Sequence, residues 1–266
     1  MQILNTIASL LSEKTINIGV VINYCTNDYQ FLKHCISQAT LFSKSVIVPY
    51  TDHFYDGTPE NLNLLDLSIK ENPSAQFVKF DYNANLDVPS QHWVTYARWI
   101  GLQALENKID YVIFLDADEV FDGQRMKTWL QKTNLFKYAA LKLSNYYYFR
   151  ETKYRAETLE DSAVIVKRDQ ISYETIMDYL DRESIYQGAV GKKKRMTHHM
   201  DGKPMIHHYS WVRTKNEMLK KVISWGHNTE RDWVQMVENE FEHEFSGKDF
   251  VHGHNYKTVE PYIVLK

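Results

Sequence analysis

The stretch YVIFLDADE, from Tyr111 to Glu119, places an apolar run directly before three acidic residues. Such a run predicts a strand that is buried on both faces of a parallel sheet. In open α/β sheets ligands bind outside the carboxyl ends of the strands, so Asp116 and Asp118 are expected at a binding crevice. Alternate residues of an extended segment share a side, and oxygen ligands suit Mg²⁺ or Mn²⁺. The stretch therefore predicts a cation site, the alternative being acids that cap a turn and face solvent.

Further strand-like segments precede this stretch at regular intervals. They cover residues 16–23, 45–50 and 75–80, so that successive strands begin 29, 30 and 36 residues apart. Helical periodicity lies between them, over 28–42, from Thr58-Pro59 onward, and from Ser90 onward. Each step fits one β-α-β unit, which predicts an α/β fold with a mostly parallel central sheet flanked by helices.

The pattern changes after Asp118 and predicts a mixed region. We expect a short helix over 123–131, strands over 139–149, 162–167 and 205–211, and two closing helices, one carrying Met218, Val222 and Trp225 and one over 232–245. Residues 188–203 are polar and basic and are expected to form a mobile loop, with the run 192–195 either solvated or acting as a lid over a diphosphate. With no repeat or linker, residues 1–266 are predicted to form one domain, comprising a half over 16–120 and a half over 121–266.

Composition excludes several classes of protein. The 266 residues are 44% hydrophobic and 24% charged, which indicates a soluble globular chain, and the net charge of −3 argues against nucleic acid as a partner. Cys25 and Cys35 are expected to be free thiols, which favours a cytoplasmic location. We predict a surface helix over 1–11 and no transmembrane segment, which leaves peripheral membrane association open. P-loop, G-x-G-x-x-G and G-x-S-x-G motifs are absent.

Four segments together resemble the GT-A glycosyltransferases, especially those like family 2. They are IGVVINYCTNDYQFLKHCI (18–36), VIVPYTDHFYDGT (46–58), Ala97-Arg98 with Gly101 leading into the 111–119 stretch, and IHHYSWVRTKNEMLKK (206–221). Asn27-Asp28 stands where the family has Asn-Glu, and Asn23 and Tyr24 stand where it has a Pro.

The resemblance implies a nucleoside diphosphate sugar as donor, UDP-linked in the first instance, bound with Mn²⁺ or Mg²⁺. It implies that residues 16–120 form the nucleotide-sugar-binding half and that residues 121–266 form the acceptor half and the C-terminal helices. It places Asp116 at the donor and the metal, Asp118 at the metal, and Arg98 near the nucleotide. For Arg98 the alternative is a surface arginine that extends to solvent. The remaining donor contacts that it implies are Tyr24 and Asp28 near the nucleoside and Asp52 at the base.

A histidine is expected to complete the metal site. Eight of the 11 histidines fall after residue 190, and the resemblance places a metal-binding histidine in the 206–221 segment. Neighbouring residues of a strand face opposite sides, so only one of His207 and His208 can face the site. We select His208, with His207 as the alternative ligand and a structural or solvated role as the alternative for either. His198, His199, His252 and His254 remain unassigned, and a zinc site made of histidines stays open.

The predicted activity is transfer of a hexosyl unit to a hydroxyl of a glycan, a glycoconjugate or another acceptor. In the resemblance, the base that accepts the hydroxyl proton comes after the D-x-D motif, often in a Glu-Asp pair, which selects Asp161; the alternative is a turn acid. A nucleotidyltransferase and a non-catalytic nucleotide-sugar-binding protein are the rival hypotheses. The first normally has a Gly-rich basic loop after the first strand, and residues 23–28 contain no Gly, Lys or Arg. Donor sugar, acceptor and stereochemical outcome are left open.

Overall fold

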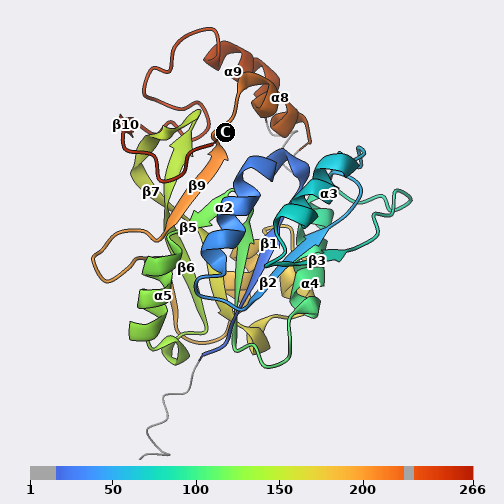
Figure 1. Cartoon of the computed structure of the whole chain (residues 1–266), viewed down its shortest axis with the longest axis vertical. Coiled ribbons are helices and arrows are strands. Elements are labelled where there is room, and N and C mark those ends of the chain that lie inside the picture. The colour runs from blue at the N-terminus through green and yellow to red at the C-terminus, as the bar shows by residue number, and fades with distance from the viewer. Residues whose placement is uncertain (1–15, 225–230, 266) are drawn as a thin grey trace, which may run out of the picture.

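A computed structural model describes residues 16–224 and 231–265 (Figure 1). The helix expected over 1–11 and the expected helical position Trp225 lie outside these residues. The strands are β1 (Ile18–Asn23), β2 (Ser45–Tyr50), β3 (Gln76–Lys79), β4 (Tyr111–Asp116), β5 (Glu119–Phe121), β6 (Ala140–Phe149), β7 (Glu151–Lys167), β8 (Lys193–Thr197), β9 (Ile206–Trp211) and β10 (Tyr256–Thr258). The α-helices are α2 (Tyr29–Ala39), α3 (Leu62–Glu71), α4 (Ser90–Ala104), α5 (Gly123–Lys132), α6 (Tyr173–Ile176), α7 (Arg182–Gly188), α8 (Lys215–Ser224) and α9 (Trp233–Glu240).

The first half forms the predicted parallel sheet. Strands β3, β2, β1 and β4 lie side by side in this order, and each neighbouring pair is parallel. The register aligns Asn23 at the end of β1 with Asp116 at the end of β4. The expected α/β fold is thus confirmed, and the polar residues that follow both strands meet at one edge of the sheet.

The second half continues the same sheet in mixed directions. β7 is antiparallel to β4, β6 is antiparallel to β7, and β9 runs parallel to β6 and antiparallel to β5. The last pairing sets Glu119 opposite His208, so the late strand adjoins the acidic turn after β4. The mixed second half expected from the sequence is present, and its strands belong to the sheet of the first half.

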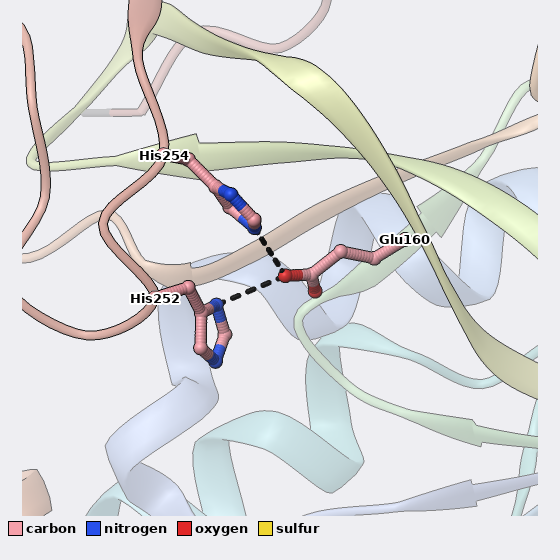
Figure 2. A group of neighbouring side chains, drawn as sticks. All are labelled: Glu160, His252 and His254. Atoms are coloured by element: carbon pink, nitrogen blue, oxygen red, sulfur yellow. Dashed lines mark hydrogen bonds and ion pairs between the residues drawn. The ribbon is translucent and has the colours of Figure 1, made fainter.

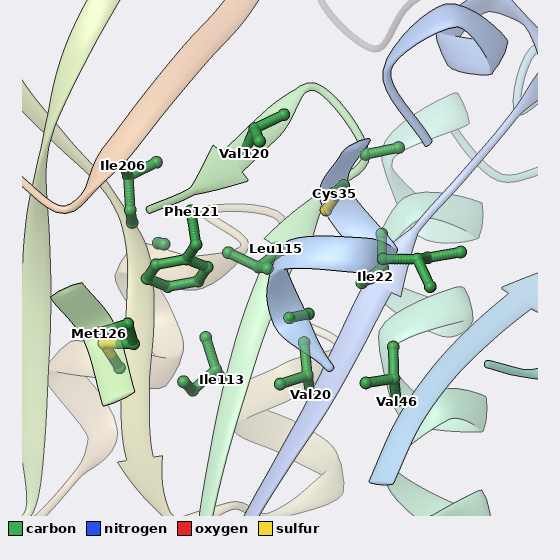
Figure 3. Packing of buried hydrophobic residues seen from close by; sticks show 14 of the residues in the cluster. Val20, Ile22, Cys35, Val46, Ile113, Leu115, Val120, Phe121, Met126 and Ile206 are labelled. Carbon is green, nitrogen blue, oxygen red and sulfur yellow. The ribbon is translucent and has the colours of Figure 1, made fainter. Parts of the chain in front are cut away.

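Helices cover both faces of the central strands. Successive side chains of a strand point to opposite faces, and in these strands the side chains on both faces are apolar. Val20 and Ile22 of β1 point toward α2 and pack with Phe31, Leu32 and the buried Cys35, as Figure 3 shows in part. Val21 points the other way and joins a second cluster, together with buried residues of α4, α6 and α7. Strands apolar on both faces are what the continuous runs in the sequence predict. Cys25 and Cys35 are free thiols, as expected.

Three expectations about element boundaries were wrong. The helix expected from Thr58-Pro59 begins at Leu62, since Asn61 caps it by accepting the Leu64 N–H, and Pro59 bridges to His53 instead. The strand expected over 162–167 is the end of a 17-residue strand, β7. The helix expected over 232–245 ends at Glu240.

The expectation of a mobile loop over 188–203 was also wrong. Residues 193–197 form β8, which pairs in parallel with β6. The Arg195 side chain contacts Asp161 and Glu183 at 2.8 Å each, and Lys193 donates to the Gln187 carbonyl. The basic run is therefore held by acidic partners and by strand pairing, a combination that charge density alone did not reveal. Among the described residues, none of the helices has both the length and the apolar character needed to cross a bilayer.

Gly101 provides a test of how tightly α4 packs on the sheet. A Cβ at this position would lie 2.4 Å from Cγ1 of Val21 on β1. We expect Gly101→Ala to lower the free energy of unfolding by about 1–3 kcal/mol, because overpacking outweighs the better helix propensity of alanine. Urea denaturation measures the change, and Gln103→Ala, at an exposed position of the same helix, should stay within about 0.5 kcal/mol of the wild type. Unchanged stability of Gly101→Ala would contradict this packing.

Candidate functional site

A cleft of about 530 Å³ lies at the carboxyl ends of β1 and β4. Its walls come from the loop after β1, from α4 and α7, from β6 and β7, and from the segment that joins β9 to α8. The lining contains six acidic side chains, namely Asp28, Asp116, Asp118, Asp161, Asp181 and Glu183. It also contains five basic ones, namely Arg98, Lys142, Arg182, Arg213 and Lys221. The charges nearly balance, so the cleft does not attract anions by net charge alone.

Asp116 is held by two arginines. Its Oδ1 accepts from Arg98 of α4 and its Oδ2 accepts from Arg182 of α7, each at 2.8 Å. Burial opposes ionisation, but the charges of Arg182 and Arg98 outweigh it and hold the pKa of Asp116 below its usual range. Arg98 also donates to Asp181 and is 1% exposed, so the alternative of a solvent-facing arginine was wrong.

Glu119 anchors the same network from inside the protein. It is fully buried, accepts from Arg182 at 2.5 Å, and accepts from the Asp116 backbone N–H at 2.9 Å. Arg182 was not found from the sequence, because the segment 168–188 shows no strong periodicity and no motif. Glu119 could be foreseen only as part of the acidic run, without a partner.

Asp118 points to a different group of residues from Asp116. Its Oδ1 lies 3.6 Å from Nε2 of His208, and its Oδ2 lies 3.6 Å from both Arg213 and Lys221. Burial would raise the pKa of Asp118, but Lys221, His208 and Arg213 together hold it well below its usual range. Asp118 Oδ1 and His208 Nδ1 are both buried without a hydrogen-bond partner. Nε2 is the ring nitrogen that faces Asp118, so a cation between the two side chains would satisfy Oδ1 of Asp118 and bind Nε2 of His208, whereas Nδ1 points away from that position.

The two neighbouring histidines face opposite ways, as the strand pattern predicts. His208 faces Asp118, whereas His207 stacks on Tyr262 with ring centroids 4.0 Å apart. The Tyr148 hydroxyl lies 2.7 Å from Nδ1 of His207, and burial lowers the pKa of this imidazole to about 3. His208, rather than His207, is thus the histidine beside Asp118.

Arg213 connects the late segment to the loop after β1. It is buried, donates to the Asn27 carbonyl at 2.5 Å, and pairs with Asp28. Burial raises the pKa of Asp28 despite this arginine. Tyr24 also lines the cleft, although its hydroxyl is engaged with Ser68 at 2.5 Å. The sequence placed Arg213 inside a resembling segment without assigning it a role.

Two other predicted residues lie in different surroundings. Asp52 does not line the cleft; it contacts Lys79 at 3.0 Å and His53 at 2.7 Å. Asp161 does line the cleft and pairs with Lys142 and Arg195. Burial opposes its ionisation, but Arg195 and Lys142 lower the pKa of Asp161 below its usual range. The structure therefore brings Asp116, Asp118, Arg98, His208, Asp28, Tyr24 and Asp161 to one cleft and leaves Asp52 outside it.

The comparisons with known proteins find similar backbone folds and no match in sequence. No protein-family model matches the sequence, and no curated protein matches it. Similar solved structures include a 4-diphosphocytidyl-2C-methyl-D-erythritol synthase from Anaerococcus prevotii, at 9% identity and a TM-score of 0.46, covering 76% of this chain and 94% of that one. TarS 1–349 of S. aureus matches at 10% identity with a TM-score of 0.42, covering 79% of this chain and 65% of that one. The glycosyltransferase GlyE of Streptococcus pneumoniae matches at 11% identity with a TM-score of 0.41, covering 86% of this chain and 64% of that one.

The ion pairs of Arg182 can be tested by removing its charge. We expect Arg182→Met to lower the free energy of unfolding by about 3–5 kcal/mol, because Glu119 keeps its charge in the interior without its cation. The double variant Glu119→Gln/Arg182→Met should recover part of this loss, since the buried charge is gone. Chemical denaturation of the single and double variants measures both.

The matched control for this cycle is Lys108→Met. Lys108 pairs with Glu106 where both side chains are about two thirds exposed, at 68% and 62%. Its removal should change stability by less than about 1 kcal/mol. An Arg182→Met protein as stable as Lys108→Met would contradict a structural role for the network.

Proposed function

We propose that the protein is a metal-dependent glycosyltransferase that moves a hexosyl unit from a nucleoside diphosphate sugar, UDP-linked in the first instance, to a hydroxyl of a glycan or another acceptor. One observation carries the proposal. In a cleft at the carboxyl ends of parallel strands, the buried Oδ1 of Asp118 lacks a hydrogen-bond partner and lies 3.6 Å from Nε2 of His208. Four guanidinium or ammonium groups, those of Arg98, Arg182, Arg213 and Lys221, line the same cleft.

The charge balance of the cleft favours joint binding of a cation and a diphosphate. Six acidic groups slightly exceed five basic ones, so a diphosphate alone gains little from the net charge. Asp118 and His208 would hold Mn²⁺ or Mg²⁺. The resemblance assigns Asp116 as the second carboxylate, and each of its oxygens has a lone pair beyond the one its arginine uses. The ligand atoms of Asp116, Asp118 and His208 do not all lie within 4.8 Å of one another, so joint binding requires these side chains to draw together. When bound, such an ion neutralises charge on a diphosphate leaving group.

The chain's own residues would then act on the two ends of the substrate. Arg213 and Lys221 lie within 3.6 Å of Asp118 and are suited to contact phosphate oxygens. Tyr24 and Asp28 line the cleft on the side of the loop after β1 and are assigned to the nucleoside. Asp52 keeps the contact with the base on the resemblance alone, because it lies outside the cleft lining.

Binding of the donor can be tested with UDP and Mn²⁺. At 100 times its dissociation constant a ligand stabilises the fold by about 2.7 kcal/mol, and we expect this stabilisation to require both components. Asp118→Asn should abolish the Mn²⁺-dependent part, whereas Asp66→Asn, at an exposed position of α3, should preserve it. Thermal unfolding with and without each component measures the effect, and an unchanged metal-dependent shift in Asp118→Asn would refute the assignment.

Product analysis separates the proposed activity from its rivals. Incubation with UDP-sugars and an acceptor library should release UDP and form a glycoside. Release of inorganic diphosphate from a nucleoside triphosphate would instead indicate a nucleotidyltransferase, and tight binding without turnover would indicate a nucleotide-sugar-binding protein.

Asp161 is proposed as the base that takes the proton of the acceptor hydroxyl. It lines the cleft and is ionised at neutral pH, as a base must be, while the charges of Arg195 and Lys142 that lower its pKa also make it a weaker base. We expect Asp161→Asn to lower kcat by about 10²–10⁴-fold while leaving donor affinity unchanged. Glu183→Gln is the matched control, because Glu183 contacts the same Lys142 and Arg195. Equal losses of kcat in the two variants would mean that Asp161 acts only through its ion pairs.

A further inference from the structure

A second group of metal-type ligands lies outside the cleft lining, between β7 and the loop before β10 (Figure 2). Oε1 of Glu160 is 2.9 Å from Nδ1 of His252 and 2.8 Å from Nε2 of His254. The three ligand atoms all lie within 4.8 Å of one another. We propose that Glu160, His252 and His254 form a binding site for a divalent transition metal, with Zn²⁺ as the ion that this donor set suits best.

The backbone of the loop is fixed in a shape that presents both imidazoles. The buried carboxylate of Asp249 accepts from the backbone N–H groups of four residues at 2.6–3.1 Å, namely Val251, His252, Gly253 and His254. Gly253, between the two histidines, has φ +74°, a conformation that a side chain would strain. Figure 2 shows the two rings turned toward the same glutamate oxygen. The loop therefore holds the backbone of both histidines in place without help from a metal, which lowers the ordering cost of binding one.

The donor atoms select the class of metal. Two imidazole nitrogens and one carboxylate oxygen suit Zn²⁺ and its neighbours in the first transition series, whereas Mg²⁺ and Ca²⁺ favour oxygen ligands alone. Ligands of a tetrahedral Zn²⁺ with bonds of about 2.0–2.1 Å stand about 3.4 Å apart, so the nitrogen–oxygen distances of 2.8 and 2.9 Å need to open by roughly half an ångström. Rotation of the partly exposed side chains can provide this change.

Three protein ligands leave a fourth coordination position open. The His252 side chain is 42% exposed, so water can reach the site. A bound metal would join the C-terminal segment to β7, in addition to the pairing of β10 with β7. Among the described residues, no other group of three or more His, Cys, Asp or Glu side chains has its ligand atoms all within 4.8 Å of one another. The site therefore differs from the Asp118–His208 pair, which has two such side chains.

The experiment uses the full chain after chelation and dialysis, titrated with Zn²⁺ by calorimetry in an Asp118→Asn background that removes the cleft ligand. We expect one Zn²⁺ per chain and a rise in Tm. Glu160→Gln and His254→Ala should each weaken Zn²⁺ binding by about 100-fold or more, since loss of a direct ligand exceeds the effect of losing an outer partner. His243→Ala removes an exposed histidine from the start of the segment between α9 and β10, and this variant should bind Zn²⁺ as tightly as the background does.

Two outcomes would overturn the proposal. One is the absence of stoichiometric Zn²⁺ binding to the Asp118→Asn protein, which would leave the three side chains as a hydrogen-bonded group. The other is binding that survives both Glu160→Gln and His254→Ala. Glu160→Gln keeps an acceptor for the imidazole N–H groups, so its far-UV spectrum and its Tm without metal should match the background and separate lost ligation from misfolding.

Discussion

The pairing of Asp116 with Arg98 and Arg182 is the constraint on which the cleft depends. Taking these charges out of water is costly, and the pairs offset that cost only because each oxygen of Asp116 has its own guanidinium. The two arginines come from α4 and α7, so the same contacts fix two helices against the end of β4. Arg98 and Arg182 are occupied by this network, and the second carboxylate, Asp118, faces His208, Arg213 and Lys221 instead.

The two aspartates of the motif differ in their surroundings, so one can stabilise the fold while the other can bind a ligand. The pairs on Asp116 are short, whereas the nearest charged atoms to Asp118 are all 3.6 Å away. Oδ1 of Asp118 is buried without a hydrogen-bond partner, so it can accept a ligand without breaking a hydrogen bond. The turn after β4 thus places a carboxylate bound by two arginines two residues away from one whose neighbours His208, Arg213 and Lys221 all lie 3.6 Å away.

The sequence predicted the features that depend on local patterns. Strand runs at intervals of about 30 residues identified the parallel half, and alternation along 206–211 separated His208 from His207. Features that depend on distant pairing escaped it. The role of Arg182 depends on its ion pairs with Glu119 and Asp116, which lie more than 60 residues earlier in the chain. Its short helix carries no clear periodicity. Residues 193–197 appeared to be a loop because the partners that hold the basic side chains come from β6, β7 and α7.

The alternation of β7 links the cleft to the C-terminal segment. Asp161 lines the cleft, while its neighbour Glu160 reaches His252 and His254 in the loop before β10. Tyr147 of β6 lies between the two groups, with ring centroids 5.4 Å from His208, 5.3 Å from His252 and 6.2 Å from His254. Close-packed interiors transmit strain, and the Tyr147 ring is therefore a direct contact path between the two loop histidines and His208. The C-terminal segment is thereby part of the wall that positions the cleft histidine, although it contributes no side chain to the cleft lining.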